Sequence, residues 1–127
     1  MAGVVVDTSV WIDFFAGEQT PDLEDSLAQG LVVIPPLVVA ELVSGASTAN
    51  QRAAIGELLQ DAPIHDSNLQ HWIAVGDLRR NLKKKGLTVT VPDAHVAQCA
   101  LDRDALLLSR DEIFEKIARH TKLRVRC

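Results

Sequence analysis

The run Val4-Val5-Val6, followed at once by Asp7, is the feature that most constrains the fold of this chain. Three consecutive β-branched residues predict a short strand that is buried on both faces. Strands of this kind occur in parallel sheets covered by helices, and such sheets bind ligands at the carboxyl ends of their strands. The pattern therefore places an ionisable side chain, Asp7, where an α/β sheet would hold a ligand.

Apolar strands and helical segments alternate along the rest of the chain. Further strands are expected at 31–34, 105–108 and 123–125, with a candidate short strand at 62–65. Helices are expected at 10–15, 22–29, 37–43, 49–60, 68–85, 92–103 and 111–119. This alternation predicts an α/β fold, a three-layer α/β/α arrangement around a central parallel sheet of about four to five strands. No repeat or long linker divides the chain, so residues 1–127 are expected to form a single domain.

Composition excludes several classes of protein. An apolar fraction of 47% and a charged fraction of 24% are typical of a globular protein. Neither a secretory segment nor an apolar run long enough to span a membrane is present, so a cytoplasmic location and no membrane partner are expected. The cysteines, Cys99 and Cys127, form neither a disulfide framework nor a zinc-ligand spacing. A net charge of −4 argues against a general nucleic-acid binder, but not against a nuclease whose acids are neutralised by divalent cations.

Glu41 is the most informative single acid. In the predicted helix 37–43 it shares a face with Leu37 and Val38, at spacings of four and three residues. An acid pressed against that apolar surface would be costly unless a cation or a proton compensated its charge. The alternative is that the helix turns Glu41 to water or to an arginine.

Asp93 and Asp111 each have a structural explanation as well as a functional one. Thr90 and Asp93 fit a capping box at a helix start, so Asp93 alone is better explained as a cap than as a ligand. Ser109 and Glu112 fit a second capping box. That assignment leaves Asp111, at the second helical position, beside the carboxyl end of a strand, where it is an even choice between cap and ligand.

Taken together, the four acids favour a metal site. If Asp7, Glu41, Asp93 and Asp111 converge, each close pair repels by about 4 kcal/mol at about 4 Å and an effective dielectric near 20. Without cations one carboxyl would have to hold a proton. Ligands that are all oxygen suit Mg²⁺ or Mn²⁺, and such a site can activate water for an in-line phosphodiester displacement.

Four ordered motifs resemble the PIN domain family, and within it the VapC-type toxins of bacterial toxin–antitoxin pairs. They are Val-Val-Asp7-Thr8-Ser9-Val-Trp-Ile-Asp13, Val39-Ala40-Glu41-Leu42-Val-Ser-Gly45, Pro92-Asp93-Ala94-His-Val-Ala97, and Leu107-Leu108-Ser109-Arg110-Asp111 with Phe114 and Ile117. No single motif is specific, whereas the ordered set is, and it covers nearly the whole chain.

This resemblance implies a Mg²⁺- or Mn²⁺-dependent endoribonuclease, the toxin of a type II system, which is inhibited by a VapB-like antitoxin and is usually a homodimer. The family's catalytic and metal-binding acids would fall on Asp7, Glu41, Asp93 and Asp111, with Thr8, Ser9, Ser109 and Arg110 in support. Two positions depart from the family pattern. Arg110 stands where Asn or Asp is frequent, and Ile113 stands where a further Asp precedes Phe114. Arg110 puts the number of bound metals in question.

Several weaker signals have two interpretations. The basic run of Arg79, Arg80, Lys83, Lys84 and Lys85 could contact an RNA backbone, or could be a solvated helix end favoured by the helix dipole. Trp11, Phe14 and Phe15 form a stripe that suits the core, a dimer interface or a groove for an antitoxin helix. Asp13 lies off that stripe and is expected to be solvated. The histidines show no ligand spacing, and Cys99 is expected in the core.

Two rival functions remain. One is a PIN-like module that binds RNA or regulates but has lost catalysis, and Arg110 beside the acids is its best support. The other is a phosphate-accepting signalling domain that would use Asp66 and Lys122, although Asp7 lacks the acidic neighbour that such a domain needs. A phosphatase of the Asp-x-Asp type is excluded because Ser9 occupies the second acidic position.

Overall fold

The computed structural model describes residues 3–126 and contains one parallel sheet. Its strands lie in the order β2-β1-β3-β4, and each neighbouring pair is parallel. The strands are β1 (Val4–Val6), β2 (Val32–Val33), β3 (Leu106–Leu108) and β4 (Arg124–Arg126). The predicted α/β class, with its central parallel sheet, is confirmed.

Seven helices connect or cover these strands within the described residues. They are α1 (Thr8–Phe15), α2 (Pro21–Ala28), α3 (Pro36–Gly45), α4 (Ala49–Asp61), α5 (Leu69–Lys84), α6 (Val91–Arg103) and α7 (Ile113–Ala118). Proline begins α2 and α3, where its missing N–H costs nothing. The side chains of Thr48, Asn68 and Thr90 cap α4, α5 and α6 by accepting backbone N–H bonds.

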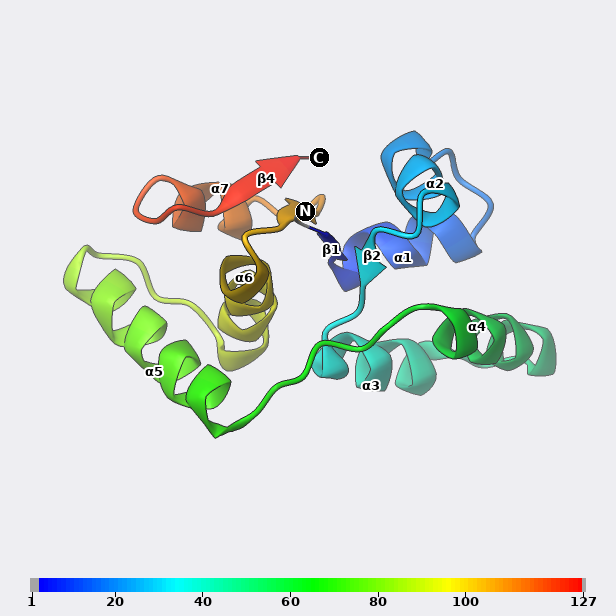
Figure 1. Cartoon of the computed structure of the whole chain (residues 1–127), viewed down its shortest axis with the longest axis horizontal. Helices are drawn as coiled ribbons and strands as arrows, with labels where there is room; N and C mark the ends of the chain where they lie inside the picture. Colours follow the sequence, from blue (N-terminus) through cyan, green and yellow to red (C-terminus); the bar gives the residue numbers. More distant parts are fainter. Residues whose placement is uncertain (1–2, 127) are drawn as a thin grey trace.

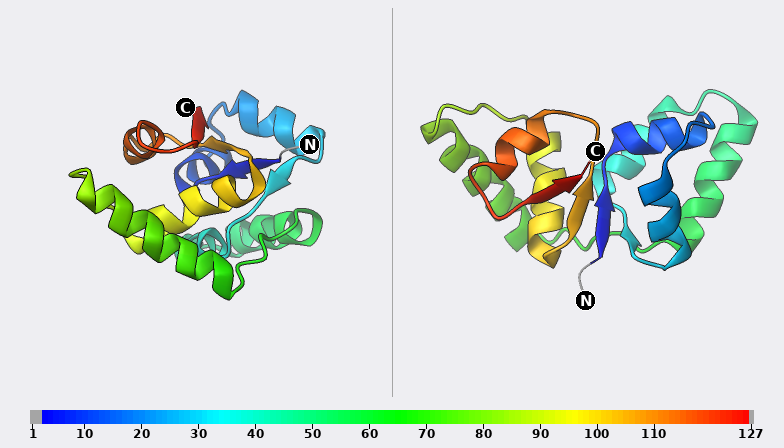
Figure 2. Two further views of the ribbon diagram at one scale, coloured as in Figure 1. Left: turned by 60° about the vertical axis from the view of Figure 1, so that its left-hand side comes forward. Right: turned by 90° about the horizontal axis from the view of Figure 1, so that it is seen from above.

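Helices lie on both sides of the sheet (Figure 1). The step from β1 to β2 and the step from β3 to β4 run in opposite directions across the sheet, so right-handed crossovers put their helices on opposite faces. Accordingly α2 packs on β2, α6 packs on β1 and β3, and α7 packs on β4 and α6. The long helix α5 packs against the outer side of α6 (Figures 1 and 2).

The core is built from β1, β3 and the inner faces of the surrounding helices. Val5, Val6 and Leu107 are fully buried, and so are the large side chains Trp11 and Phe114. Trp11 is therefore a core residue, while Phe14 and Phe15 pack partly buried against the core. Cys99 is buried as expected, and Cys127 lies outside the described residues. Between residues 3 and 126 no helix combines the length and apolar character that a bilayer crossing requires.

Two predicted elements differ from the structure. The candidate strand at 62–65 is only a single bridge between Ile64 and Ile34. The predicted helix 111–119 begins two residues later, at Ile113, because the carboxylate of Asp111 accepts the N–H of Ile113 and closes a turn before the helix. Asp111 is therefore not at the second helical position.

Candidate metal centre

The register of the sheet brings Asp7 and Ser109 together. Val6 lies opposite Leu108, so the residues that follow these strands, Asp7 and Ser109, lie at the same edge of the sheet. Ser109 Oγ donates a 3.0 Å hydrogen bond to Asp7 Oδ2, and Ser9 Oγ donates to the same oxygen at 2.8 Å. Asp7 is 8% exposed and Ser109 is 1% exposed. Two hydroxyls thus fix the orientation of a nearly buried carboxylate.

Asp111 is linked to the same edge through Ser109. The N–H of Asp111 donates to Ser109 Oγ at 3.0 Å, and the N–H of Arg110 donates to Ser9 Oγ at 3.1 Å. The predicted capping box of Ser109 and Glu112 is wrong, because the Ser109 hydroxyl is used by Asp7 and Asp111 and α7 has no side-chain cap. Ser109 instead joins two of the predicted acids.

Glu41 reaches the site from α3, but not in the predicted environment. Its side chain is exposed, although Val38 on the same helix is fully buried. Thr8 Oγ1 donates a 2.8 Å hydrogen bond to Glu41 Oε1, which joins the start of α1 to α3. The expected desolvation of Glu41 against an apolar surface is therefore wrong, because the inner face of α3 ends at Val38 and Leu42 and leaves Glu41 at its margin.

Asp93 lies in the first turn of α6, which Thr90 caps, and the charges of the other acids act on it. Its N–H donates to Thr90 Oγ1 at 3.3 Å. Burial raises the pKa of Asp93 most, and a hydrogen bond with Thr90 opposes that rise. The negative charges of Asp111, Asp7 and Glu41 raise its pKa further. Three carboxyls from three other segments therefore act on Asp93, and we call Asp7, Glu41, Asp93 and Asp111 the acid cluster.

The acid cluster fits a hard divalent cation. Its donors are all carboxylate oxygens, which Mg²⁺ and Mn²⁺ prefer over nitrogen or sulfur. Burial is the main cause of the raised pKa of Asp93, and a cation would remove the smaller part that comes from the neighbouring negative charges. The hydroxyls of Thr8, Ser9 and Ser109 orient the carboxylates of Glu41 and Asp7, as outer-shell groups do in metal sites.

Arg110 and Asp13 form an ion pair beside the cluster. The Nε of Arg110 contacts Asp13 Oδ2, and both side chains are partly exposed. Asp13 is therefore not simply solvated, contrary to the sequence-based expectation. The guanidinium group is held by an acid outside the acid cluster.

The basic run lies along the same edge of the molecule as the cluster. In the right-hand view of Figure 2, the carboxyl ends of β1 and β3, the start of α6 and the C-terminal end of α5 all lie toward the top. Arg79 Nε donates to the carbonyl of Val89, Arg80 pairs with Asp77, and Lys85 Nζ donates to the carbonyl of His120. Lys83 and Lys84 are exposed.

A network on the other side of α6, buried except for Asp102, was missed at the level of sequence. Asp102 Oδ2 lies 2.6 Å from His71 Nδ1 and 3.1 Å from His65 Nε2. His71 Nε2 lies 2.7 Å from His95 Nδ1, and Cys99 Sγ lies 3.7 Å from His95 Nε2. We call these five residues the histidine network. A signal was available, because His95, Cys99 and Asp102 are spaced by four and three residues and so share one face of α6.

An apolar groove is lined by none of the residues of the acid cluster. It has a volume of about 550 Å³ and is bordered by α1, α2 and α4, with Phe14, Phe15, Leu27 and Leu58 among its lining residues. Glu57 and Asp61 add acidic groups to its wall.

Comparison with known proteins gives a family match over most of the chain. The model of the PIN domain family matches residues 4–120. Ribonuclease VapC11 of Mycobacterium tuberculosis is 26% identical over 128 residues, which cover 94% of this chain and 95% of the relative. A VapC ribonuclease of Mycobacterium bovis is similar to the same extent.

Solved structures share the fold at lower sequence identity. The DNA-bound VapBC of Salmonella typhimurium has a TM-score of 0.83 and 22% identity, and the match covers 99% of this chain and 98% of the other. VapBC2 of Rickettsia felis, bound to a promoter DNA fragment, has a TM-score of 0.77 and 20% identity, with 97% and 96% coverage. These likenesses support the three-layer arrangement described above.

Proposed function

Because the chain belongs to the PIN domain family, we propose that it is the toxin of a type II toxin–antitoxin system and acts as a metal-dependent endoribonuclease. The proposed nuclease domain is the single unit of residues 1–127. One observation supports this function most: Ser109 joins Asp7 and Asp111 at the carboxyl edge of the parallel sheet, where the charges of Asp7, Glu41 and Asp111 also act on Asp93. The curated relatives, which are named as VapC ribonucleases, support the substrate class.

Asp7, Glu41, Asp93 and Asp111 are the proposed metal ligands, and Mg²⁺ or Mn²⁺ is the proposed ion. When bound, such an ion activates water and stabilises the charge that develops on a phosphodiester. The chain's own residues prepare the site. Ser9 and Ser109 hold Asp7 through its Oδ2, Thr8 holds Glu41, and the backbone of Asp111 is tied to Ser109. Fixed carboxylates keep the site's geometry without reorganisation during the reaction.

RNA is proposed to lie along the edge that carries both the acid cluster and the basic end of α5. Lys83 and Lys84 are exposed and suit phosphate contacts, while Arg79 and Lys85 also donate to backbone carbonyls of neighbouring segments. Lysine and arginine contacts to phosphate position a nucleic acid without reading its sequence. Positive charge outside the acid cluster would also offset the repulsion between its carboxylates and the RNA backbone.

The partners proposed are a VapB-like antitoxin and a second copy of the chain. The apolar groove lined by Phe14, Phe15 and Leu58 suits the apolar face of an antitoxin helix, and Glu57 and Asp61 suit basic residues on it. The VapBC complexes among the structural neighbours support an antitoxin partner. Light scattering of the purified chain, with and without the antitoxin, tests both assemblies.

A cleavage assay tests the proposed activity. Purified protein should cut RNA with Mg²⁺ or Mn²⁺ and should stop when a chelator is added. Asp93→Asn should remove cleavage, whereas Asp66→Asn should not, because Asp66 is an exposed acid outside the cluster. RNA binding that the chelator does not change, together with no cleavage in Mg²⁺ or Mn²⁺, would instead support an inactive RNA-binding module. The pairing of Arg110 with Asp13 weakens that alternative, since the arginine does not neutralise the acid cluster.

A further inference from the structure

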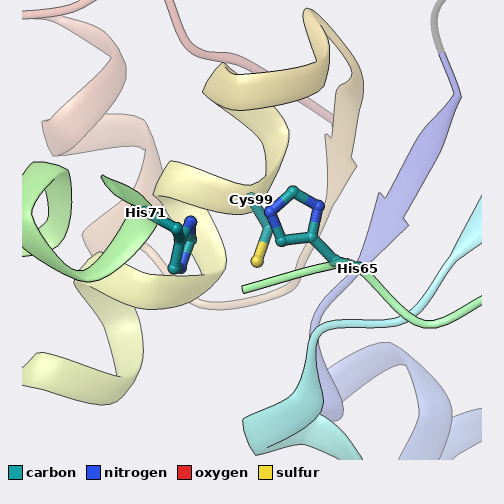
Figure 3. Close-up of side chains that lie close together, drawn as sticks. All are labelled: His65, His71 and Cys99. Atoms are coloured by element: carbon teal, nitrogen blue, oxygen red, sulfur yellow. The ribbon is translucent and has the colours of Figure 1, made fainter. Parts of the chain in front are cut away.

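The geometry points to a second, separate metal site, in which His65, His71 and Cys99 bind a borderline divalent cation such as Zn²⁺. One ligand atom from each of these residues lies within 4.8 Å of the others, and all three residues are buried. Figure 3 shows the Cys99 sulfur between the two imidazole rings. Imidazole nitrogen and thiolate sulfur are the ligands that Zn²⁺ takes in proteins, whereas Mg²⁺ and Mn²⁺ prefer oxygen.

His65 is buried beside the other two proposed ligands. Its side chain is 6% exposed, and its Nδ1 is buried with no hydrogen-bond partner. Its Nε2 lies 3.1 Å from Asp102 Oδ2, so the ring proton is assigned to Nε2 and the lone pair to Nδ1. Figure 3 shows Nε2 on the side of the ring that faces Cys99 and His71, with Nδ1 on the far side. A cation would therefore bind at Nε2 in place of the hydrogen bond to Asp102, and the ring proton would move to Nδ1.

His71 is oriented by the same carboxylate. Its Nδ1 lies 2.6 Å from Asp102 Oδ2, which assigns the proton to Nδ1 and leaves the lone pair on Nε2. Gln98 donates to the other oxygen of Asp102 at 2.8 Å and fixes the carboxylate. For His71, a carboxylate that accepts from the ring nitrogen not used for the metal is the usual outer shell of a zinc site.

His95 completes the arrangement without being a ligand. Its Nδ1 lies 2.7 Å from His71 Nε2 and 4.0 Å from Cys99 Sγ. Cation binding would replace the bond to His71, and the N–H of His95 would then donate to the ligated sulfur of Cys99. Trp72 stacks on the His95 ring with centroids 4.7 Å apart and keeps the ring in place.

Binding must remove the thiol proton. A Zn–S bond forms as the S–H bond of Cys99 breaks, and the proton leaves to solvent. Burial raises the pKa of the Cys99 thiol, so the thiol is neutral before the cation binds. Affinity should therefore rise with pH, and one proton should be released for each cation.

The bound cation would join three segments. His65 lies in the loop before α5, His71 in the first turns of α5, and Cys99 in α6. Since α6 also carries Asp93 at its start, the site would fix the helix that supplies one acid of the cluster. The ligands themselves lie on the opposite side of α6 from that acid, so the two sites are chemically independent.

Co²⁺ is the most direct probe, because its spectrum reports geometry and thiolate ligation. Chelator-stripped protein, titrated with Co²⁺ in excess Mg²⁺, should show tetrahedral ligand-field bands and a thiolate charge-transfer band that saturate at one ion per chain. Zn²⁺ should displace the Co²⁺ and raise the melting temperature. Absence of the bands in the wild-type protein would overturn the proposal.

Matched variants locate the site. Cys99→Ala should remove the charge-transfer band, and His65→Gln should weaken binding even if the cysteine variant fails to fold. Asp102→Asn should lower the affinity about 10- to 100-fold. Cys127→Ser and His120→Gln should leave the spectrum unchanged, and a band that persists in Cys99→Ala or disappears in Cys127→Ser contradicts the site. Asp93→Asn should also retain the band, which separates this result from any failure of the proposed nuclease.

Discussion

Ser109 donates a 3.0 Å hydrogen bond to Asp7 although 102 positions separate them in the chain. The same hydroxyl accepts the N–H of Asp111 at 3.0 Å. One small side chain, 1% exposed, therefore joins two acids of the cluster. Ser109 therefore holds these two acids in position relative to each other, which its small size alone would not indicate.

Ser109→Ala should reduce metal affinity and cleavage about 10- to 100-fold, the usual effect of removing an outer-shell group. The carboxylate of Asp7 would lose one of its two hydroxyl donors and become less well oriented. Isothermal titration with Mn²⁺ and RNA cleavage rates measure the two effects. Ser44→Ala is the matched control, since the Ser44 hydroxyl donates only to a carbonyl of its own helix; an equal loss in both variants would refute the role of Ser109.

Asp93→Asn should stabilise the metal-free protein while it abolishes cleavage. The pKa of Asp93 is raised in the folded state, so folding binds protons there and stability falls as the pH rises through that pKa. The amide removes this penalty at neutral pH. Melting temperatures in chelator should therefore be higher for Asp93→Asn, and the rise caused by Mg²⁺ should be smaller than in the wild type. A lower melting temperature in chelator would contradict the electrostatic explanation.

Asp13→Asn should weaken Mg²⁺ binding through Arg110. Without its partner, the guanidinium group is free to turn toward the acid cluster and compete with the cation. The pair is partly exposed, so the expected change is modest, about fivefold in the dissociation constant. The double variant Asp13→Asn/Arg110→Gln should restore the affinity. If the double variant is as weak as the single one, Asp13 acts by another route.

The histidine network should make the metal-free protein sensitive to acid. Burial lowers the pKa of His95 from 6.5 to about 4, and burial also lowers the pKa of His65. Each histidine binds a proton near pH 6.5 in the unfolded state, but only at a lower pH in the folded state. Stability is therefore full above pH 6.5 and is lost as the pH falls toward about 4, by at most about 1.4 kcal/mol per pH unit per histidine.

Denaturant unfolding in chelator between pH 4.5 and 8 measures this dependence. Because Asp102 keeps a lowered pKa, through bonds from Gln98, His71 and His65 that outweigh its burial, it stays ionised over the range. His95→Gln should flatten the pH dependence whatever its effect on absolute stability. His120→Gln, at an exposed position, should keep the wild-type slope.

Lys83→Gln and Lys84→Gln should weaken RNA binding without changing the chemical step. Each lost phosphate contact should reduce the slope of log affinity against log salt by about 1. Lys116→Gln is a control on α7, which does not belong to the basic run. Fluorescence anisotropy with a labelled RNA, in Ca²⁺ or with the Asp93→Asn variant to prevent cleavage, gives the slopes. Equal slopes for all variants would place the RNA elsewhere.

The sequence predicts the elements of this fold well because the signals are local. Apolar β-branched runs mark β1 and β3, and proline or threonine marks the starts of α3 and α6. The acids at strand ends could be found for the same reason, since parallel strands end at a common edge. The positions of β1 and β3 were enough to place Asp7 and Asp111 near that edge.

What sequence reasoning missed depends on pairing between distant segments. The exposure of Glu41 is set by where the inner face of α3 ends against its neighbours, and the pairing of Asp13 with Arg110 is set by the neighbouring positions of β1 and β3. The histidine network combines a loop and two helices. The regular spacing of its residues in α6 could be read from the sequence, but nothing in the sequence showed that His65 and His71 would lie beside them.

The adjacency of β1 and β3 also has a consequence during synthesis. A ribosome-bound chain that has emerged only through α6 already carries Asp7, Glu41 and Asp93, but it lacks the strand that brings Ser109 and Asp111 to them. Contacts so distant in sequence close late in folding. The edge that carries the acid cluster is thus assembled only when translation is nearly finished, and we expect a truncated or stalled product to lack the proposed activity.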